Sequence, residues 1–267
     1  MSEIDNPRPF EIDVVGDVAT LWLNRPAKRN AVTFEMWEQL PSVLDEILTH
    51  DVRVLIVRGR GGHFCAGADI TGIGRNLGDA GVPGGYRDLN ARAEQALADF
   101  PLPTIALIEG NCIGGGWQIA SACDLRMAGR SVLFGITPAK LGISYPSGCV
   151  ERTVALVGPS TTKRMLFTAE LIDAEEAFRL GFFDYLIDDE SLVERSDALC
   201  DELRSRSLLT QVATKANVNA LVEGNPALDD IIARYEALAV DNEDLLEGLA
   251  AFGERRVATF TWRPIRN

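Results

Sequence analysis

The alternation of apolar and polar residues predicts a mixed α/β chain that begins with a hairpin. Residues 10–15 and 18–23 alternate in the manner of half-buried strands, and Gly16-Asp17 between them has the composition of a two-residue turn. The runs at 52–57 and 104–108 are apolar throughout, which is typical of parallel strands buried on both faces. Shorter apolar runs predict further strands, at 125–127, 132–134 and 183–187.

Apolar residues at helical spacing separate these strands. Thr33 precedes one such pattern and predicts a capped helix over 33–49, in which Pro41 should cause a kink or a break. The glycine-rich segment 71–85 is expected to be mobile and to cover a site. We expect an α/β core over 1–200 and a helical section over 201–267, with helices at 86–100, after Pro159, after Asp173, and at 190–206, 208–222, 226–240 and 242–257.

A glycine triplet lies at the centre of the chain. Gly114, Gly115 and Gly116 stand between the apolar strand 104–108 and a short apolar helix predicted over 117–123. A strand, a glycine turn and a helix together place backbone N–H groups at a positive helix end, which favours an anion or a developing oxyanion. The triplet alone is also explained by close packing of the helix on the strand.

Composition and charge exclude several classes of protein. The 267 residues are 46% hydrophobic, enough for a sizeable core, and the formal net charge of −13 argues against nucleic acid as a partner. No apolar run has the length of about 18 residues that a membrane span needs, and the acidic first residues contain no secretory signal. Five widely spaced cysteines without a CxxC pair predict reduced thiols in the cytoplasm and no metal site.

Seven segments, taken in order, carry a family resemblance. They are LNRPAKRNAV (23–32), FCAGADI (64–70), GNCIGGGWQIASACDLRMAG (110–129), FGITPAKLGISYPSG (134–148), LIDAEEA (171–177), GFFDYLID (181–188) and EGLAAFGERR (247–256). Together they resemble the crotonase (enoyl-CoA hydratase/isomerase) superfamily. The resemblance implies an α/β fold, a spiral of ββα units with a helical C-terminal oligomerisation section, in a homotrimer or a hexamer made of two trimers. It also implies an acyl-CoA thioester as substrate, with coenzyme A as part of that substrate and no tightly bound cofactor.

The resemblance also implies roles for particular residues. The backbone N–H groups of Ala68 and Gly115 would hold the thioester oxygen, where enolate formation places negative charge. Lys28 and Arg29 match the loop that meets the coenzyme A phosphates, although a solvated basic turn is the alternative. The remaining positions implied at the coenzyme A thioester are Ala31, Ala66, Asp69 and Ile70, and for Asp69 a loop-capping role is an alternative.

The sequence departs from the hydratase pattern at both catalytic carboxylates. The two glutamates that the family places around a catalytic water align with Gln118 and Pro138. An amide can orient a water or the thioester, but it cannot titrate as a general base does. Gln118 therefore stands as a catalytic candidate that acts by hydrogen bonding, with a satisfied buried amide as the alternative.

The loop that contains Pro138 resembles methylmalonyl-CoA decarboxylase of the same superfamily through the pattern TP-x-x-LG-x-x-Y. Decarboxylation needs no general base, and Thr137 and Tyr145 are the candidates for orienting the carboxylate and returning a proton. We predict an acyl-CoA lyase or isomerase that acts through a stabilised enolate. We rank decarboxylation, or another reaction that needs no carboxylate, slightly above hydration. The alternatives are hydration with another acid/base residue and a non-catalytic acyl-CoA-binding protein.

Overall fold

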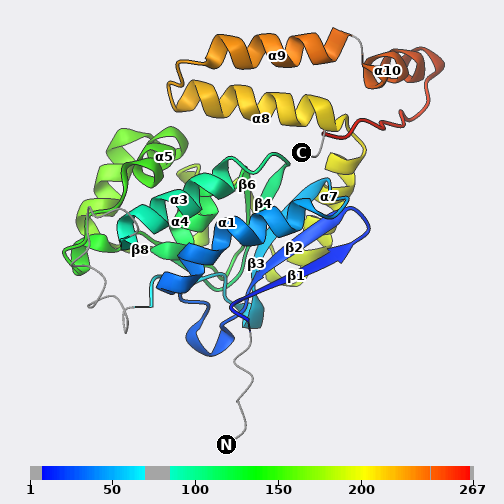
Figure 1. Ribbon diagram of the computed structural model, residues 1–267. Coiled ribbons are helices and arrows are strands. Elements are labelled where there is room, and N and C mark those ends of the chain that lie inside the picture. Colours follow the sequence, from blue (N-terminus) through cyan, green and yellow to red (C-terminus); the bar gives the residue numbers. More distant parts are fainter. Residues whose placement is uncertain (1–7, 70–84, 241, 265–267) are drawn as a thin grey trace, which may run out of the picture. The chain divides into compact units, whose positions relative to one another are not determined.

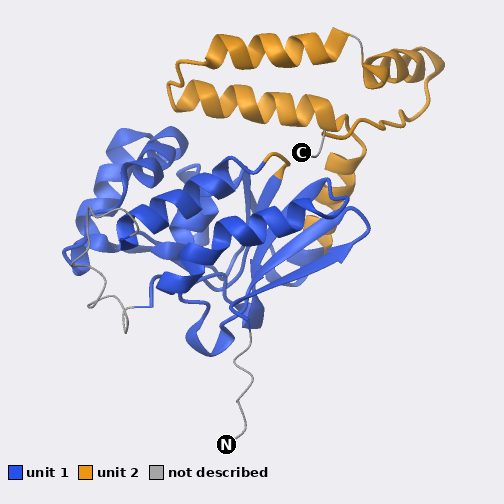
Figure 2. Ribbon diagram, in the orientation of Figure 1, with its two compact units in different colours: residues 1–100, 104–193 blue, residues 101–103, 194–267 orange. Residues whose placement is uncertain are grey.

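The computed structural model describes residues 8–69, 85–240 and 242–264. The predicted cover at 71–85 therefore lies outside the described residues except for Gly85. The chain forms two compact units (Figure 2). Unit 1 consists of residues 1–100 and 104–193, and unit 2 of residues 101–103 and 194–267. The functional division predicted after residue 200 stays a prediction.

A six-stranded sheet forms the centre of unit 1 (Figure 1). Its strand order is β1 (Phe10–Val15), β2 (Val18–Leu23), β3 (Val54–Gly59), β4 (Thr104–Ile108), β6 (Leu125–Gly129) and β9 (Tyr185–Ile187). Only the β1–β2 pair is antiparallel, and Gly16 at its turn has a φ of 62°. Residues 54–57 and 104–108 are buried throughout. The predicted mixed α/β class with a mostly parallel sheet is confirmed.

A second, smaller sheet contains two strands that the sequence pattern did not predict. Strand β7 (Leu133–Gly135) pairs in parallel with β5 (Asn111–Ile113) and antiparallel with β8 (Leu171–Asp173). Each of these strands has three residues, which is too short for an alternating pattern to be visible. Phe134 in β7 is buried against the ring of Phe182, with ring centroids 4.2 Å apart.

Helices α1 (Phe34–Leu48), α3 (Tyr86–Ala98), α4 (Gly115–Ala122) and α5 (Ser147–Thr168) pack on one another in that order. Thr33 caps α1 as predicted, by accepting a hydrogen bond from the Met36 N–H. Pro41 lies inside α1, which continues past it, so of the predicted kink or split the split does not occur. Helix α5 has two halves, because Gly158 breaks it with a φ of 77°. The half that follows the break begins at Pro159 as predicted, and the half from Ser147 was not predicted.

The remaining elements follow the predicted pattern closely. In unit 1, Asp173 caps α6 (Ala174–Arg179) as predicted. Unit 2 contains α7 (Leu192–Arg204) from Glu194 onward and the helices α8 (Leu208–Val222), α9 (Leu228–Val240) and α10 (Glu243–Glu254). Helices α8 and α9 form an antiparallel pair (Figure 1). No helix among the described residues is long and apolar enough to cross a membrane.

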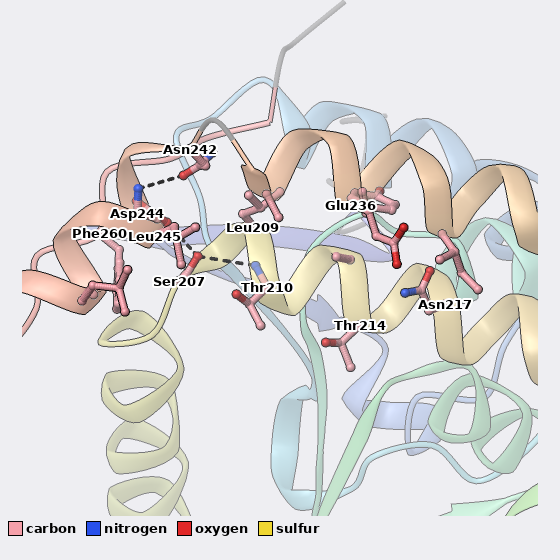
Figure 3. Close-up of a pocket in the computed structure, with 16 residues that line it drawn as sticks. Ser207, Leu209, Thr210, Thr214, Asn217, Glu236, Asn242, Asp244, Leu245 and Phe260 are labelled. Atoms are coloured by element: carbon pink, nitrogen blue, oxygen red, sulfur yellow. Dashed lines mark hydrogen bonds between the residues drawn. The ribbon is translucent and has the colours of Figure 1, made fainter. Parts of the chain in front are cut away.

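A cavity of about 500 Å³ lies within unit 2, between α8, α9 and α10 (Figure 3). The Asp244 carboxylate beside it accepts hydrogen bonds from the Ser207 hydroxyl at 2.7 Å and from the Thr261 N–H at 2.9 Å. These bonds fasten residue 261 to the start of α10. The lining contains none of the residues that the sequence singled out for chemistry.

Candidate active site

The predicted glycine turn is present where α4 begins. Gly114 has φ 54° and ψ −106°, a conformation that side chains disfavour. The Gly114 N–H donates to the Gly135 carbonyl at 3.0 Å, and α4 starts at the next residue. Because Gly115 is the first helical residue, its N–H has no partner within the helix. It donates to no residue in the part of the chain that the structure describes.

The second predicted N–H group belongs to the adjacent loop. Ala68 lies opposite Val32 in an isolated parallel bridge. The bridge is made by the Val32 N–H, which donates to the Gly67 carbonyl at 2.8 Å, and the Asp69 N–H, which donates to the Val32 carbonyl at 2.8 Å. Within residues 8–69, 85–240 and 242–264, the Ala68 N–H has no acceptor. A Cβ atom on Gly115 would lie 3.4 Å from the Gly67 carbonyl carbon, so the two loops are in contact.

Close packing of Gly116 fixes these loops together. A Cβ atom on Gly116 would lie 2.6 Å from the Cys65 carbonyl oxygen and 2.9 Å from the Cys65 Cβ. The Cys65 backbone is itself held on both sides, since its N–H donates to Asn111 at 2.8 Å and its carbonyl accepts from Ile113 at 3.0 Å. The position therefore requires glycine for space rather than for φ. Close packing and N–H presentation, the two explanations of the triplet, thus fall on different glycines.

Replacing Gly116 with alanine is expected to destabilise the fold by about 1–3 kcal/mol, the usual cost of overpacking. Gly115→Ala is the matched control, because its new Cβ would meet its nearest atoms at 3.4–3.5 Å, an ordinary contact distance. Urea unfolding of both variants measures the difference. Equal free energies of unfolding would contradict the packing argument.

Tyr145 reaches the same turn from the loop before α5. Its ring packs edge-on against Trp117, with centroids 5.0 Å apart and planes at 69°. A Cβ atom on Gly114 would lie 3.2 Å from the Tyr145 hydroxyl oxygen, which places that hydroxyl beside the turn. Burial raises the pKa of Tyr145 well above its usual value of 10, and neighbouring acidic groups add to the effect. The phenol is therefore neutral and remains a hydrogen-bond donor.

Thr137 lies on the same loop as Tyr145 but shows no comparable contact. It precedes a single 3₁₀ turn over Pro138–Lys140, and its carbonyl accepts from the Lys140 N–H at 3.3 Å. Its half-buried hydroxyl makes no hydrogen bond to a described residue. The structure accounts for Thr137 as the start of a turn, and its role toward a substrate stays a prediction.

Gln118 belongs to a buried polar cluster on the adjoining helices. Its Nε2 donates to the Asn90 Oδ1 at 2.8 Å and to the Glu94 Oε2 at 3.2 Å. The Asn90 Nδ2 in turn reaches the Gln118 Oε1 at 3.4 Å. All three side chains are almost completely buried. The amide of Gln118 is thus tied to α3, and a part in the reaction stays a prediction.

Glu94 is the ionisable group that the sequence reasoning missed. Desolvation raises the pKa of Glu94 to about 7. The positive charge of Arg152, whose guanidinium lies 3.3 Å from the carboxylate, acts in the opposite direction and lowers this pKa. Glu94 falls on the buried face of α3, one residue after Ala93 and three before Leu97. The sequence does contain a signal for this group, because Glu94 stands where the helical period predicts an apolar residue.

The predicted coenzyme A loop packs directly on the loop of Ala68. The Ala66 N–H donates to the Arg29 carbonyl at 2.9 Å, and the Lys28 and Arg29 side chains are exposed. Asp69 forms an ion pair with Arg25 at 2.8 Å, which gives it a structural partner.

Arg25 connects two of the predicted positions. Its guanidinium pairs with Asp69 and also donates to the Ala31 carbonyl. The structure therefore gathers the predicted positions from 28 to 69 into one region. Ile70 lies outside the described residues.

Comparison with known proteins agrees with this arrangement. The model of the enoyl-CoA hydratase/isomerase family matches residues 14–263. A crotonyl-CoA hydratase from Syntrophomonas wolfei is 32% identical, covering 91% of this chain and 94% of its own. A short-chain-enoyl-CoA hydratase from Clostridium acetobutylicum is 30% identical, covering 90% and 93%. The crystal structure of an enoyl-CoA hydratase/isomerase family member superposes with a TM-score of 0.89 at 36% identity, covering 96% and 97%. The chain therefore belongs to the enoyl-CoA hydratase/isomerase family, the crotonase superfamily.

Proposed function

We propose that the protein is an enzyme that converts an acyl-CoA thioester through an enolate, whose oxygen accepts hydrogen bonds from the Ala68 and Gly115 N–H groups. The observation that carries the proposal is a pair of N–H groups that have no acceptor among the described residues and that belong to two loops in direct contact. Gly115 also begins α4, so the positive end of the helix dipole adds to the stabilisation of a negative oxygen.

Decarboxylation is the reaction that we place first. The bond from the α-carbon to the carboxylate breaks, its electron pair forms the enolate, and carbon dioxide leaves. A proton then returns to the α-carbon from the neutral Tyr145 hydroxyl or from water. This sequence requires no base at Gln118 or Pro138, the positions where the hydratase carboxylates are missing. Thr137 stays a candidate for orienting the substrate carboxylate.

Hydration is the second candidate, because one observation favours it. Glu94 supplies a carboxyl group whose pKa is about 7, the range that general acid–base catalysis needs, and it contacts Gln118. Water addition to an enoyl thioester would then depend on a carboxyl group on α3 in place of the two family glutamates. The hydratase activities of the relatives named above are consistent with this alternative.

Mass spectrometry of coenzyme A thioesters after incubation with the purified protein distinguishes these reactions. Malonyl-CoA and methylmalonyl-CoA are expected to lose the mass of carbon dioxide, and Tyr145→Phe is expected to slow this about 100-fold. If a 2-enoyl-CoA instead gains the mass of water, the reaction is hydration and the decarboxylation proposal is wrong. Binding of every thioester without any change, including no double-bond shift by chromatography, would support the non-catalytic alternative.

The coenzyme A part of the substrate is proposed to lie over the loop that contains Lys28 and Arg29. Both side chains are exposed, and the loop is fixed to the Ala68 segment through Arg29 and Arg25. Two exposed cations can neutralise the negative charge of the coenzyme A phosphates locally, although the net charge of the protein is −13. A cytoplasmic location stays a prediction.

Assembly into a trimer or hexamer is proposed to use unit 2. Several large apolar side chains on α8 and α10 are exposed there, including Leu221, Leu246, Leu249 and Phe252. Exposed apolar groups at this density favour a protein interface. Sedimentation is expected to give about three or six times the chain mass of 29.1 kDa. The double variant Leu249→Asp/Phe252→Asp is expected to sediment as a monomer, and an unchanged mass would contradict this interface.

A further inference from the structure

Three helices contribute to the polar cluster around Gln118. Helix α3 provides Asn90 and Glu94, α4 provides Gln118, and α5 provides Arg152 and Cys149. Glu94 is 1% exposed and Gln118 is 2% exposed, so water cannot replace their partners freely. Buried polar groups keep the orientation that satisfies their hydrogen bonds, because an unpaired one is costly.

The NH₂ group of the Gln118 amide is better satisfied than its oxygen. A side-chain amide has two N–H donors and two acceptor lone pairs. Both donors are used, by the Asn90 Oδ1 at 2.8 Å and the Glu94 Oε2 at 3.2 Å, while the Cys149 sulfur lies farther away at 3.8 Å. The Oε1 atom receives one long bond, 3.4 Å from the Asn90 Nδ2. Its second lone pair has no donor among the described residues.

The Glu94 carboxylate decides this orientation. An ionised carboxylate only accepts hydrogen bonds, so the end of Gln118 that faces it must be the NH₂ group. The Arg152 guanidinium at 3.3 Å, also bound by the Gln95 Oε1 at 3.3 Å, favours the ionised form. The orientation of the Asn90 amide is then determined as well, because its Oδ1 must face the NH₂ group of Gln118.

We propose that Glu94 is a positioning residue for Gln118, and that its carboxylate makes the Gln118 Oε1 a hydrogen-bond acceptor for a hydroxyl group or water at the acyl part of the substrate. Gln118 follows Gly115 by three residues on α4, so the two lie on the same side of the helix. The inference rests on the proposed acyl-CoA site. It adds that the site recognises a donor near the thioester when Glu94 is ionised.

Protonation of Glu94 removes the constraint. A neutral carboxyl group can donate, so the Gln118 amide can turn its oxygen toward α3 and its NH₂ group away from it. Because the pKa of Glu94 is about 7, this change falls near neutral pH. The other titratable groups that face Glu94 are Tyr145 and Cys149, and burial raises the pKa of both, so they stay neutral in this range. Arg152 keeps its charge.

The test uses S-butyl-CoA and S-(3-hydroxybutyl)-CoA, thioethers that differ by one hydroxyl group and cannot enolise. The ratio of their dissociation constants, measured by calorimetry, is expected to favour the hydroxyl compound about 3- to 10-fold more at about pH 8.5 than at about pH 6. Glu94→Gln is expected to abolish this pH dependence. Gln95→Ala, which loses a contact to the same guanidinium but none to Gln118, is expected to keep it.

A second measurement applies even where Glu94→Gln does not fold. In wild-type protein labelled with ¹⁵N-glutamine, the Gln118 side-chain resonance, assigned by its loss in Gln118→Met, is expected to shift with a midpoint near pH 7. A resonance that does not change with pH, or a thioether ratio equal at both pH values, would overturn the inference and leave the proposed function intact. Failure of both thioethers to bind would overturn the acyl-CoA site and this inference together.

Discussion

Replacing Gly115 with proline is expected to lower kcat/KM about 100- to 1000-fold, the usual loss when one oxyanion donor is removed. Gly115 is the first residue of α4, and proline is tolerated at that position because the N–H has no partner within the helix. The substitution therefore removes the proposed donor while leaving the hydrogen bonds of the helix in place. Initial rates are measured on the thioester that changes mass in the panel.

Gly115→Ala provides the comparison, since it keeps the N–H and adds a Cβ at ordinary contact distances. Its kcat/KM is expected to exceed that of Gly115→Pro at least tenfold, on the order of 1.4 kcal/mol of transition-state stabilisation. Circular dichroism establishes that both variants fold. Equal losses in the two variants would indicate that the space at Gly115 matters and that its N–H does not.

Replacing Arg152 with methionine is expected to destabilise the fold by about 1–2 kcal/mol at about pH 8, because the buried Glu94 carboxylate loses its cation and must then take up a proton. The loss should be smaller at about pH 6. A carboxyl group whose pKa is raised on folding binds more protons in the folded state, so stability falls as the pH rises through the interval between the unfolded and folded pKa values. Loss of Arg152 raises the folded-state pKa of Glu94 further above about 7, so the interval between the two pKa values becomes wider. Chemical unfolding at both pH values measures the effect.

Two further variants identify the cause of that loss. Glu94→Gln/Arg152→Met removes both charges and is expected to recover most of the stability at the higher pH. Arg130→Met breaks the ion pairs to Glu175 at 3.0 Å and Asp188 at 2.7 Å, all of them exposed, and is expected to cost at most about 1 kcal/mol. A pH-independent loss in Arg152→Met would assign it to packing of the side chain instead of charge.

The main sheet could be predicted because its strands are long and regularly patterned. Residues 10–15 and 18–23 alternate, and the helix at 208–222 has its predicted bounds. Strands β5 and β8 could not be predicted, since three residues carry no period and their pairing depends on β7, distant in sequence. Pro159 begins the second half of α5 as predicted, because proline suits the first position of a helix. The first half, from Ser147, was not predicted.

The candidate site divides in the same way. The resemblance placed Ala68 and Gly115 at one site, and the structure shows that their loops are in contact. Their role toward a thioester stays a prediction. The partners of Gln118 could not be predicted, because α3 and α4 meet through side chains whose separation in sequence is 24 residues or more. Glu94 gave a local signal, a charge on a buried helical face, whose meaning depends on Arg152, more than fifty residues away.

The Gly116–Cys65 contact has a consequence for how this protein changes over evolutionary time. The two loops are joined by main-chain atoms, so their geometry is complete when the chain has folded, before any ligand arrives. Side chains at 118, 137 and 138 can then be exchanged without disturbing it. A lineage could thus acquire a new reaction by altering a few nearby positions while retaining the same geometry of the two loops.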